Sequence, residues 1–504
     1  MTAPIQSESA AEAIELKRSL WASFARSVRD NVLAEVTVQV LRVGGMIVLA
    51  RELTPGDFGL LKVLVVVSVF ATVLCQFGIP DAMIQRKEVS RAHEATAWWL
   101  NVLITFIVVA GLYLLAPLIA RVMEMGGLTL GIRLMCVPLI LEGTSNGANA
   151  RLRRALRFGA IALADVVGEI GFLAGAFVLL WYGYPELSLA GGLAVRFALH
   201  ASTIWIADPR VPLGVPRLSA ARDLSRFAVS VCSGRVLIVS AGNADFLLVG
   251  RLLGSEALGF YSIAWDLLRF IPDRLFKVVG RVAFPAFSRI QEDDQELAAA
   301  YKTIVDYVAR MVLPVAGCVV IAAPEILGSI YGRQWLPAAS PMRVLSCGLA
   351  FIGLRLGIGS VYFAKDYPSF DLYLNGVRLL LIVAAVTVSV ELGGGLIAVC
   401  ASVGAVELLI TYAGQYLACM LVSMRLRELW RPMLPGLRTA AFCMAATFAG
   451  KVFAALLGIH APTVIVFVAA PAAAVFLWLE AREAVRMATS TFKRDVLRTS
   501  NQQA

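Results

Sequence analysis

Residues 51–60 read RELTPGDFGL, and a similar stretch, RLLGSEALGF, occurs at residues 251–260. Aligned with an offset of 200 positions, the two stretches share arginine at the first place, leucine at the third and glycine at the ninth. Two matching segments so far apart predict an internal duplication of the chain. A duplication of whole halves would also require further matching residues, in the same order, after each stretch.

The composition indicates a membrane protein. Of the 504 residues, 59% are apolar and 16% are charged, whereas soluble domains are about 45–50% apolar. A membrane-spanning helix needs about 20 mostly apolar residues, and the chain offers fourteen such stretches. They are predicted near residues 31–50, 58–79, 96–120, 128–148, 159–182, 187–206, 227–252, 259–283, 303–322, 338–361, 371–391, 394–420, 436–457 and 461–480. The predicted fold is an all-α polytopic membrane protein with about fourteen transmembrane helices.

Lysine and arginine collect in alternate connections between these spans, for example at Arg151, Arg153 and Arg154. Short basic loops stay on the cytoplasmic side, so both termini are predicted to be cytoplasmic in a multi-pass membrane protein. The net charge of +10 is then explained by topology and by attraction to anionic membrane lipids, and no nucleic-acid partner is predicted. The eight cysteines and three histidines are scattered, so we predict no metal site and no cofactor.

The duplication extends through both halves of the chain. Similar residues recur in order, and each pair joins equivalent spans: AMIQR at residues 82–86 with PAFSR at 285–289, Ala-Pro at 116–117 with 323–324, and Glu-Leu at 186–187 with 391–392. Six spans separate the copies, so both enter the membrane in the same direction. The predicted architecture is two parallel six-helix repeats, which form two lobes around a central cavity, plus two extra C-terminal helices. Rocking of the lobes would give alternating access.

These repeats define the expected domain organisation. The segments are a cytoplasmic N-terminal segment 1–30, an N-lobe 31–206, a cytoplasmic linker 207–226, a C-lobe 227–420, a cytoplasmic loop with helices thirteen and fourteen at 421–480, and a cytoplasmic basic tail 481–504.

Several motifs resemble a known family over about residues 30 to 420. The motifs are RELTPGDFGLL, QFGIPDAMIQR, NADFLLVGRLLGSEALGFYSIAWDL, FPAFSRIQ and GRQWLPAASPMRVL, and they resemble the polysaccharide transporter (Wzx-type flippase) family of the multidrug/oligosaccharidyl-lipid/polysaccharide (MOP) exporter superfamily. The resemblance implies a flippase of the bacterial inner membrane for undecaprenyl-pyrophosphate-linked oligosaccharide, such as an exopolysaccharide, capsule or lipopolysaccharide O-antigen repeat unit. Expected partners are membrane lipids, the polyprenyl-pyrophosphate oligosaccharide, glycosyltransferases and a polysaccharide polymerase.

Many charged residues fall inside the predicted spans, where a charge needs a partner or water. Guanidinium groups bind phosphate oxygens in bidentate fashion and stay charged when poorly hydrated. The predicted pyrophosphate contacts are Arg42, Arg235, Arg196, Arg355, Arg133 and Arg378. The alternative is that these arginines form inter-helix ion pairs with Glu142, Asp165, Glu169 and Glu407, and both interpretations stay open.

Acidic and amide residues complete the predicted cavity. Glu35 is expected to line it together with Arg42, and Asn243 and Asp245 lie further along the seventh span. Asp165 and Glu169 are one helical turn apart and could share a proton or hold Na⁺, so coupling to H⁺ or Na⁺ is one interpretation, and bonding of this pair to arginines is the other. On one helix, Asp306 and Arg310 are predicted to form an ion pair.

Three other functions make different demands on such a chain. A lipid II flippase handles similar chemistry, and a multidrug or cation antiporter of the same superfamily would favour acidic residues in its cavity. A membrane-embedded glycan polymerase or ligase would also act on polyprenyl-linked sugars, but the outward loops predicted here are short, the longest lying near residues 323–337. The sequence predicts a transporter rather than an enzyme.

Overall fold

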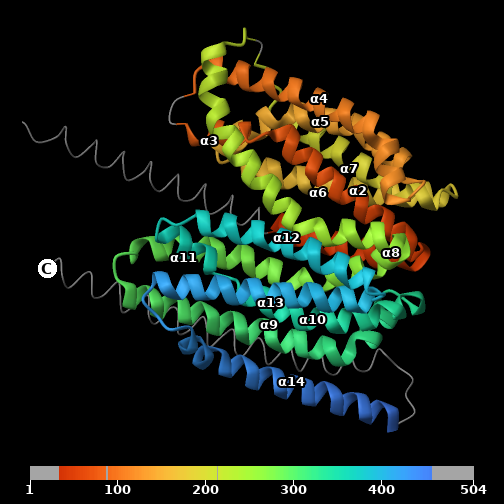
Figure 1. Cartoon of the computed structure of the whole chain (residues 1–504). Coiled ribbons are helices and arrows are strands. Elements are labelled where there is room, and N and C mark those ends of the chain that lie inside the picture. The colour runs from red at the N-terminus through yellow and green to blue at the C-terminus, as the bar shows by residue number, and fades with distance from the viewer. Residues whose placement is uncertain (1–32, 87–88, 213, 457–504) are drawn as a thin grey trace, which may run out of the picture. The chain divides into compact units, whose positions relative to one another are not determined.

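The computed structural model describes residues 33–86, 89–212 and 214–456. Within these ranges the chain is helical and contains no β-strand, as predicted (Figure 1). Eleven helices in this part of the chain are long and apolar enough to cross a membrane. The predicted number of fourteen spans stays a prediction. Two of the predicted spans lie in α8 on either side of a kink, α14 is not among the eleven, and the last predicted span, 461–480, lies outside the described residues.

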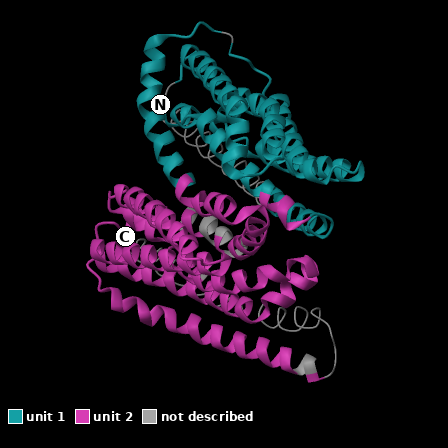
Figure 2. Ribbon diagram, turned by 45° about the vertical axis from the view of Figure 1, so that its right-hand side comes forward, with its two compact units in different colours: residues 1–53, 60–239 teal, residues 54–59, 240–504 magenta. Residues whose placement is uncertain are grey.

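The chain divides into two compact units, shown in different colours in Figure 2. The first comprises residues up to Leu53 and Leu60–Val239, and the second comprises Thr54–Gly59 and residues from Ser240 onward.

Unit 1 is a bundle of long helices, in which α4 packs on α5, and α7 packs on both α5 and α6. Its helices are Leu33–Glu52, α2 (Pro55–Gln76), the short α3 (Ile79–Gln85), α4 (Arg91–Met123), α5 (Leu128–Arg154), α6 (Phe158–Trp181), α7 (Pro185–Ala207) and the first part of α8 (Leu218–Arg289). Glycines allow the closest packing. A Cβ on Gly192 of α7 would lie 2.6 Å from the carbonyl oxygen of Phe172 on α6.

Unit 2 contains the rest of α8 and the helices that follow. They are α9 (Asp294–Ile330), the 3₁₀ turn η1 (Arg333–Ala338), α10 (Ala339–Leu354), α11 (Ile358–Ala364), α12 (Ser369–Glu391), α13 (Leu396–Leu421), the 3₁₀ turn η2 (Leu426–Leu429) and α14 (Trp430–Leu456). The helices α9, α10, α13 and α12 lie side by side in that order, and α14 packs on the outside of α9 (Figure 1). Asp293 caps α9 by accepting hydrogen bonds from the backbone N–H groups of Gln295 and Glu296, at 2.9 and 3.0 Å.

Two predicted spans are joined in α8, which has helical backbone on both sides of Gly254. Gly254 itself has φ 88° and ψ 175°, a conformation that glycine adopts without a steric penalty. The chain therefore bends at this point without leaving a loop. The helix also begins at Leu218, nine residues before the span predicted from hydropathy, because the segment preceding that span is polar but still helical.

Residues 54–59 of the first similar stretch meet the second stretch, residues 251–260, in unit 2. A Cβ on Gly59 would lie 1.9 Å from the carbonyl oxygen of Ser255, and a Cβ on Gly259 would lie 1.9 Å from that of Pro55. The contact is reciprocal, and its two sides are related by the offset of 200 positions. Only glycine permits so close an approach of two backbones.

A fully buried tryptophan anchors this crossing. The ring of Trp335 packs edge-on against Phe58, with ring centroids 5.1 Å apart, and against Phe260, with centroids 6.0 Å apart. Each phenylalanine comes from one copy of the repeated stretch, and Trp335 itself comes from the GRQWLPA segment. Parts of three motifs, the two similar stretches and the GRQWLPA segment, thus meet in unit 2.

A buried carboxylate ties the end of α7 to α5. Asp208 accepts hydrogen bonds from Nε of Arg151 at 2.6 Å and from Nε of Arg210 at 2.7 Å. Burial alone would raise the pKa of Asp208, but the hydrogen bonds from the two arginines outweigh burial and hold the pKa below its ordinary value. This carboxylate is therefore expected to stay ionised and to fix the connection between α7 and α8.

Candidate functional site

The first candidate site lies inside unit 1, around the carboxylate of Glu169 on α6. This carboxylate is buried and accepts two hydrogen bonds from Arg42, from Nε at 3.2 Å and from Nη2 at 3.0 Å. Arg196 on α7 places its Nη1 3.6 Å from the same carboxylate. The side chains of Arg42 and Arg196 are 44% and 37% exposed, whereas that of Glu169 is 2% exposed. Two accessible guanidinium groups thus share one buried carboxylate.

Close packing of α6 on α7 creates this arrangement. Gly168 lies against the backbone of Arg196 and the Cβ of His200, at 3.4 and 3.3 Å from the position of a Cβ. Because the helices approach so closely, Glu169 and Arg196 face each other across the interface. The alternative interpretation of the sequence, an inter-helix ion pair for Glu169, is what the structure contains.

Unit 2 contains a second cluster of the same composition around Glu407 on α13. Its buried carboxylate accepts hydrogen bonds from Nη1 of Arg355 at 3.2 Å and from Nε of Arg378 at 2.7 Å. Here the arginine side chains are only 20% and 12% exposed. Each unit therefore holds an Arg–Glu–Arg cluster, and we name these the Glu169 cluster and the Glu407 cluster.

The charge of each cluster follows from its composition. Two guanidinium groups and one carboxylate give a net charge of +1 when all three are ionised. Nearby carboxylates lower the positive electrostatic potential around each cluster. Asp371 acts electrostatically on Arg355, and Glu35 acts on Arg42. An arginine carries five N–H donors, and Arg42 uses two of them on Glu169. The Glu169 cluster therefore has donors to offer to a bound anion.

The other predicted pyrophosphate contacts lie elsewhere. Arg235 on α8 bonds Asp81 at the start of α3, with Nη2 to Oδ1 at 3.0 Å, and it also reaches Gln76 at 3.4 Å. Arg133 lies over the ring of Tyr113, 4.7 Å from its centroid. These two arginines are not part of either cluster, and a role for them in binding cargo stays a prediction.

The predicted polar lining of the cavity is also dispersed. Asp245 is buried on α8 and accepts a hydrogen bond from the hydroxyl of Tyr261 at 2.7 Å. Asn243 is half-buried on the same helix, and Glu35 is half-buried on the helix Leu33–Glu52. Elsewhere in unit 2, the predicted pair of Asp306 and Arg310 is present, with Nε 2.9 Å from Oδ1.

A histidine adds a group that the sequence did not suggest. His200 on α7 lies between two carboxylates, with Nδ1 3.0 Å from Oε2 of Glu142 and Nε2 3.6 Å from Oδ1 of Asp165. Asp165 thus faces His200, while Glu169 one turn away is held by arginines. The sequence did contain one indication of this role: His200 lies one helical turn after Arg196, so the two side chains share a face of α7.

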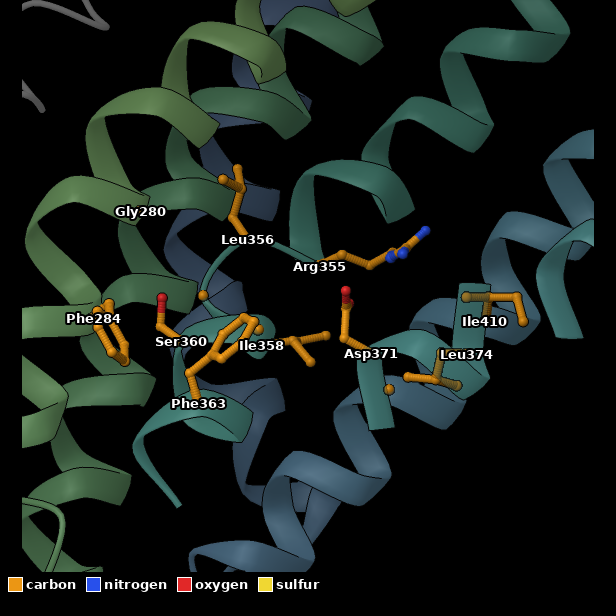
Figure 3. A pocket seen from close by; sticks show the side chains of 13 residues that line it. Gly280, Phe284, Arg355, Leu356, Ile358, Ser360, Phe363, Asp371, Leu374 and Ile410 are labelled. Atoms are coloured by element: carbon orange, nitrogen blue, oxygen red, sulfur yellow. The ribbon is translucent and has the colours of Figure 1, made fainter. Parts of the chain in front are cut away.

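Unit 2 also contains a cavity of about 470 Å³ beside the Glu407 cluster (Figure 3). It forms where a span predicted as one helix is broken. The helix α10 ends at Leu354, Gly357 takes a left-handed conformation with φ 88°, and α11 starts at Ile358. The lining residues are Gly280, Phe284, Arg355, Leu356, Gly357, Ile358, Gly359, Ser360, Phe363, Asp371, Leu374, Ile410 and Gly414.

The fold of long apolar helices is shared with solved membrane transporters. The structure is similar to that of the lipid II flippase MurJ in an inward closed conformation, with a TM-score of 0.70 and 13% identity, over 90% of this chain and 99% of that chain. It is also similar to an inward-facing multidrug resistance MATE family transporter of the MOP superfamily, with a TM-score of 0.65 and 14% identity, over 78% of this chain and 96% of that chain. At these identities the similarity establishes the fold alone.

The family is established by the sequence. Residues 48–340 match the family described as polysaccharide biosynthesis protein, which is more than half of the chain, so the protein belongs to this family. It is 25% identical to the lipopolysaccharide biosynthesis protein WzxC of Escherichia coli K12 over 73% of this chain and 75% of that protein. It is 24% identical to the teichuronic acid biosynthesis protein TuaB of Bacillus subtilis 168, over 75% and 79%. The succinoglycan biosynthesis transport protein ExoT of Rhizobium meliloti 1021 is 24% identical over 62% and 63%.

The family match confirms the predicted membership in a polysaccharide biosynthesis family, and the eleven candidate spans within the described residues agree with the predicted multi-pass membrane protein. The protein is a transporter rather than a glycan polymerase or ligase.

Proposed function

We propose that this transporter moves undecaprenyl-pyrophosphate-linked oligosaccharide across the bacterial inner membrane by alternating access, from the cytoplasmic to the periplasmic leaflet. The relatives named for lipopolysaccharide biosynthesis and for succinoglycan transport support a glycan cargo. The observation that carries the proposal is the Glu169 cluster, in which two partly exposed guanidinium groups share one buried carboxylate.

The chemistry of this cluster suits a pyrophosphate. A guanidinium presents its donors as a planar fork that matches two phosphate oxygens. Glu169 holds the inner edges of Arg42 and Arg196 and thereby fixes the direction of the outer edges. A pyrophosphate carries more than one negative charge, so it would interact with both arginines at once. The polyprenyl chain would stay in the lipid, where its apolar surface is already accommodated.

The test is transport of a fluorescent polyprenyl-pyrophosphate oligosaccharide in liposomes, measured as protection from an external reagent. We expect Arg42→Ala and Arg196→Ala each to lower the initial rate at least about tenfold, because a hydrogen bond to a charged group contributes about 1.5–3 kcal/mol. Arg42→Lys keeps the charge but loses the fork, so its rate should also fall. The control is Arg121→Ala, which removes an exposed arginine at the end of α4. Wild-type rates in both cluster variants would refute the assignment.

Two other cargoes make different predictions in the same assay. A cationic drug would be repelled by Arg42 and Arg196, so an antiporter should lose no activity when they are replaced. Lipid II carries the same pyrophosphate, and direct competition between lipid II and the oligosaccharide would reveal which one is preferred. Glycosyltransferases and a polysaccharide polymerase are proposed as partners that supply and use the cargo.

Uphill transport would need an ion, and the group around His200 is the proposed place for a proton. His200 faces Glu142 on α5 and Asp165 on α6, and Arg196 lies one turn before it on α7. Glu35 on the N-terminal helix acts electrostatically on Asp165. A proton that binds among these groups would change the charge one helical turn from the Glu169 cluster, which would link proton binding to cargo binding. Na⁺ in place of H⁺ is the alternative.

A further inference from the structure

The turn between α5 and α6 is rich in arginine and lacks acidic residues. Residues 151–157 read RLRRALR, and Arg153 and Arg157 are exposed. Nε of Arg153 donates to Oδ1 of Asn149 at 2.9 Å, and Nη1 of Arg157 donates to the carbonyl oxygen of Ala207 at 3.5 Å. Both acceptors are neutral, and neither arginine forms an ion pair with a residue that the structure describes. These two charges are therefore available to an external anion.

The other arginines near this turn hold the fold together. Arg151 and Arg210 bond the buried carboxylate of Asp208. Nη1 of Arg154 donates to two backbone carbonyl groups at the end of α3, both at 2.8 Å. A guanidinium has five N–H donors, so the two arginines without an ion pair keep most of theirs. We name residues 153–157 the basic turn.

The basic turn and the Glu169 cluster lie along the same helix, α6. Arg157 directly precedes α6, and Glu169 follows it after twelve residues, or about 18 Å at 1.5 Å per residue. Asp165 is one turn before Glu169 and shares its face of the helix. Arg153 and Arg196 both act electrostatically on Asp165, so arginines of both sites offset the charge of this intervening carboxylate. One face of unit 1 thus connects the two sites.

Apolar side chains lie beside the basic turn. Leu156, within the turn, is 51% exposed and has φ 55°, a left-handed conformation that glycine usually takes at helix ends. Ile206, in the last turn of α7, is 80% exposed and precedes Ala207, whose carbonyl oxygen accepts the hydrogen bond from Arg157. A ligand that suits both features carries an anionic group joined to a hydrocarbon chain.

Two kinds of lipid fit this description, and the arginines favour one of them. A phospholipid presents one phosphodiester, which carries one negative charge. A polyprenyl pyrophosphate presents two linked phosphates, each of which matches one guanidinium fork. Two arginines without a carboxylate partner therefore suit the pyrophosphate better.

We infer that the basic turn is the entry site of the cargo, where its pyrophosphate binds before it moves along α6 to Arg42 and Arg196. The inference rests on the proposed function, in which the cargo starts at the cytoplasmic leaflet, and this turn belongs to a connection predicted to be cytoplasmic. The pyrophosphate occupies the two sites one after the other, and both sites lie in unit 1. The polyprenyl chain stays in the lipid next to Leu156 and Ile206.

The test measures transport of the fluorescent polyprenyl-pyrophosphate oligosaccharide as a function of its concentration, in liposomes of phosphatidylcholine. For Arg153→Gln/Arg157→Gln we expect the concentration that gives half the maximal rate to rise about tenfold or more, because charge-assisted hydrogen bonds are lost. The maximal rate should stay within about twofold, because the Glu169 cluster is intact. Added salt should raise the half-maximal concentration of the wild type more than that of the variant, because salt screens exposed charges.

The matched control is Arg91→Gln/Arg222→Gln, which removes two exposed arginines on α4 and α8 from the same predicted side of the membrane. Melting temperatures show whether the variants are folded, and Arg153→Gln alone serves if the double variant is not.

An unchanged half-maximal concentration in the basic-turn variant would overturn the inference. An equal rise in the control would also overturn it, because the attraction would then come from the whole surface. A rise that occurs only in liposomes with phosphatidylglycerol would assign the turn to a phospholipid and overturn it as well. Absence of transport by the wild-type protein would instead overturn the proposed function.

Discussion

The reciprocal contact of Gly59 with Ser255 and of Gly259 with Pro55 makes a quantitative prediction. A methyl group at Gly59 would begin 1.9 Å from the carbonyl oxygen of Ser255, whereas ordinary contacts start at 3.4 Å. The backbones must therefore separate by about 1.5 Å, which is 3.4 minus 1.9. The atom in the way is backbone rather than the end of a flexible side chain, so local repacking cannot absorb the change.

Overpacking of a core costs typically about 1–3 kcal/mol, and the rigid partner places this site at the upper end. A loss of about 3 kcal/mol lowers the equilibrium constant for folding by about a hundredfold. For a unit of a few hundred residues it lowers the melting temperature by roughly 6–12 °C. We expect both Gly59→Ala and Gly259→Ala to show losses of this size.

Thermal unfolding of the purified protein in detergent measures the effect. The controls are Gly111→Ala in α4 and Gly234→Ala in α8, where a Cβ would meet nothing within 4 Å, and where alanine should be neutral or stabilising by up to about 1 kcal/mol. The double variant Gly59→Ala/Gly259→Ala should lose less than the sum of the single losses, because the first methyl already separates the backbones. If Gly59→Ala melts at the same temperature as Gly111→Ala, the close crossing is wrong.

Three further predictions concern the charged groups. Glu407→Gln should destabilise unit 2 by about 3–5 kcal/mol, because two buried guanidinium groups lose their carboxylate, and thermal unfolding would show no loss if Arg355 and Arg378 were hydrated instead. His200→Gln should flatten the pH dependence of liposome transport between about pH 5 and 8, and an unchanged profile would place proton coupling elsewhere. Asp208 has a lowered pKa, so its stabilising effect is complete above its unfolded value of about 3.9 and is lost as the pH falls through the lower folded value. The melting temperatures of wild type and Asp208→Asn should thus differ most at neutral pH and converge in acid, and a difference independent of pH would contradict the role of the carboxylate charge.

The helices and their order were predictable because each span must supply about 20 apolar residues in a row. Their interruptions were less predictable. Gly254 forms a kink between two successive helices of α8, and Gly357 lies between α10 and α11, but a glycine inside an apolar run looks the same in either case. The count of spans depends on these details, and so does the existence of the cavity beside the break.

The candidate site was predictable by residue type but not by partner. Both interpretations of the intramembrane arginines were open in the sequence, and the structure contains ion pairs at Glu169 and Glu407. The partners Arg42 and Glu169 are 127 positions apart, and no local spacing rule connects them. Arg235 was predicted, like Arg42, as a pyrophosphate contact, and no spacing in the sequence indicates that Asp81 is its neighbour. Asp371 was overlooked because a carboxylate at the start of a span usually faces the membrane surface.

The crossing at Gly59 and Gly259 also bears on the origin of the fold. Gly59 corresponds to Gly259 and Pro55 corresponds to Ser255 in the repeat, so each copy contributes the same glycine and the same backbone contact. This is the pattern of an isologous interface, which two identical subunits form about a two-fold axis. A half-length chain with one copy of the motif would already carry both surfaces of the contact, the glycine and the backbone that it touches. Such a chain could pair with itself before any duplication joined the halves, and fusion would then free each copy to change alone, one toward Thr-Pro-Gly-Asp and the other toward Gly-Ser-Glu-Ala.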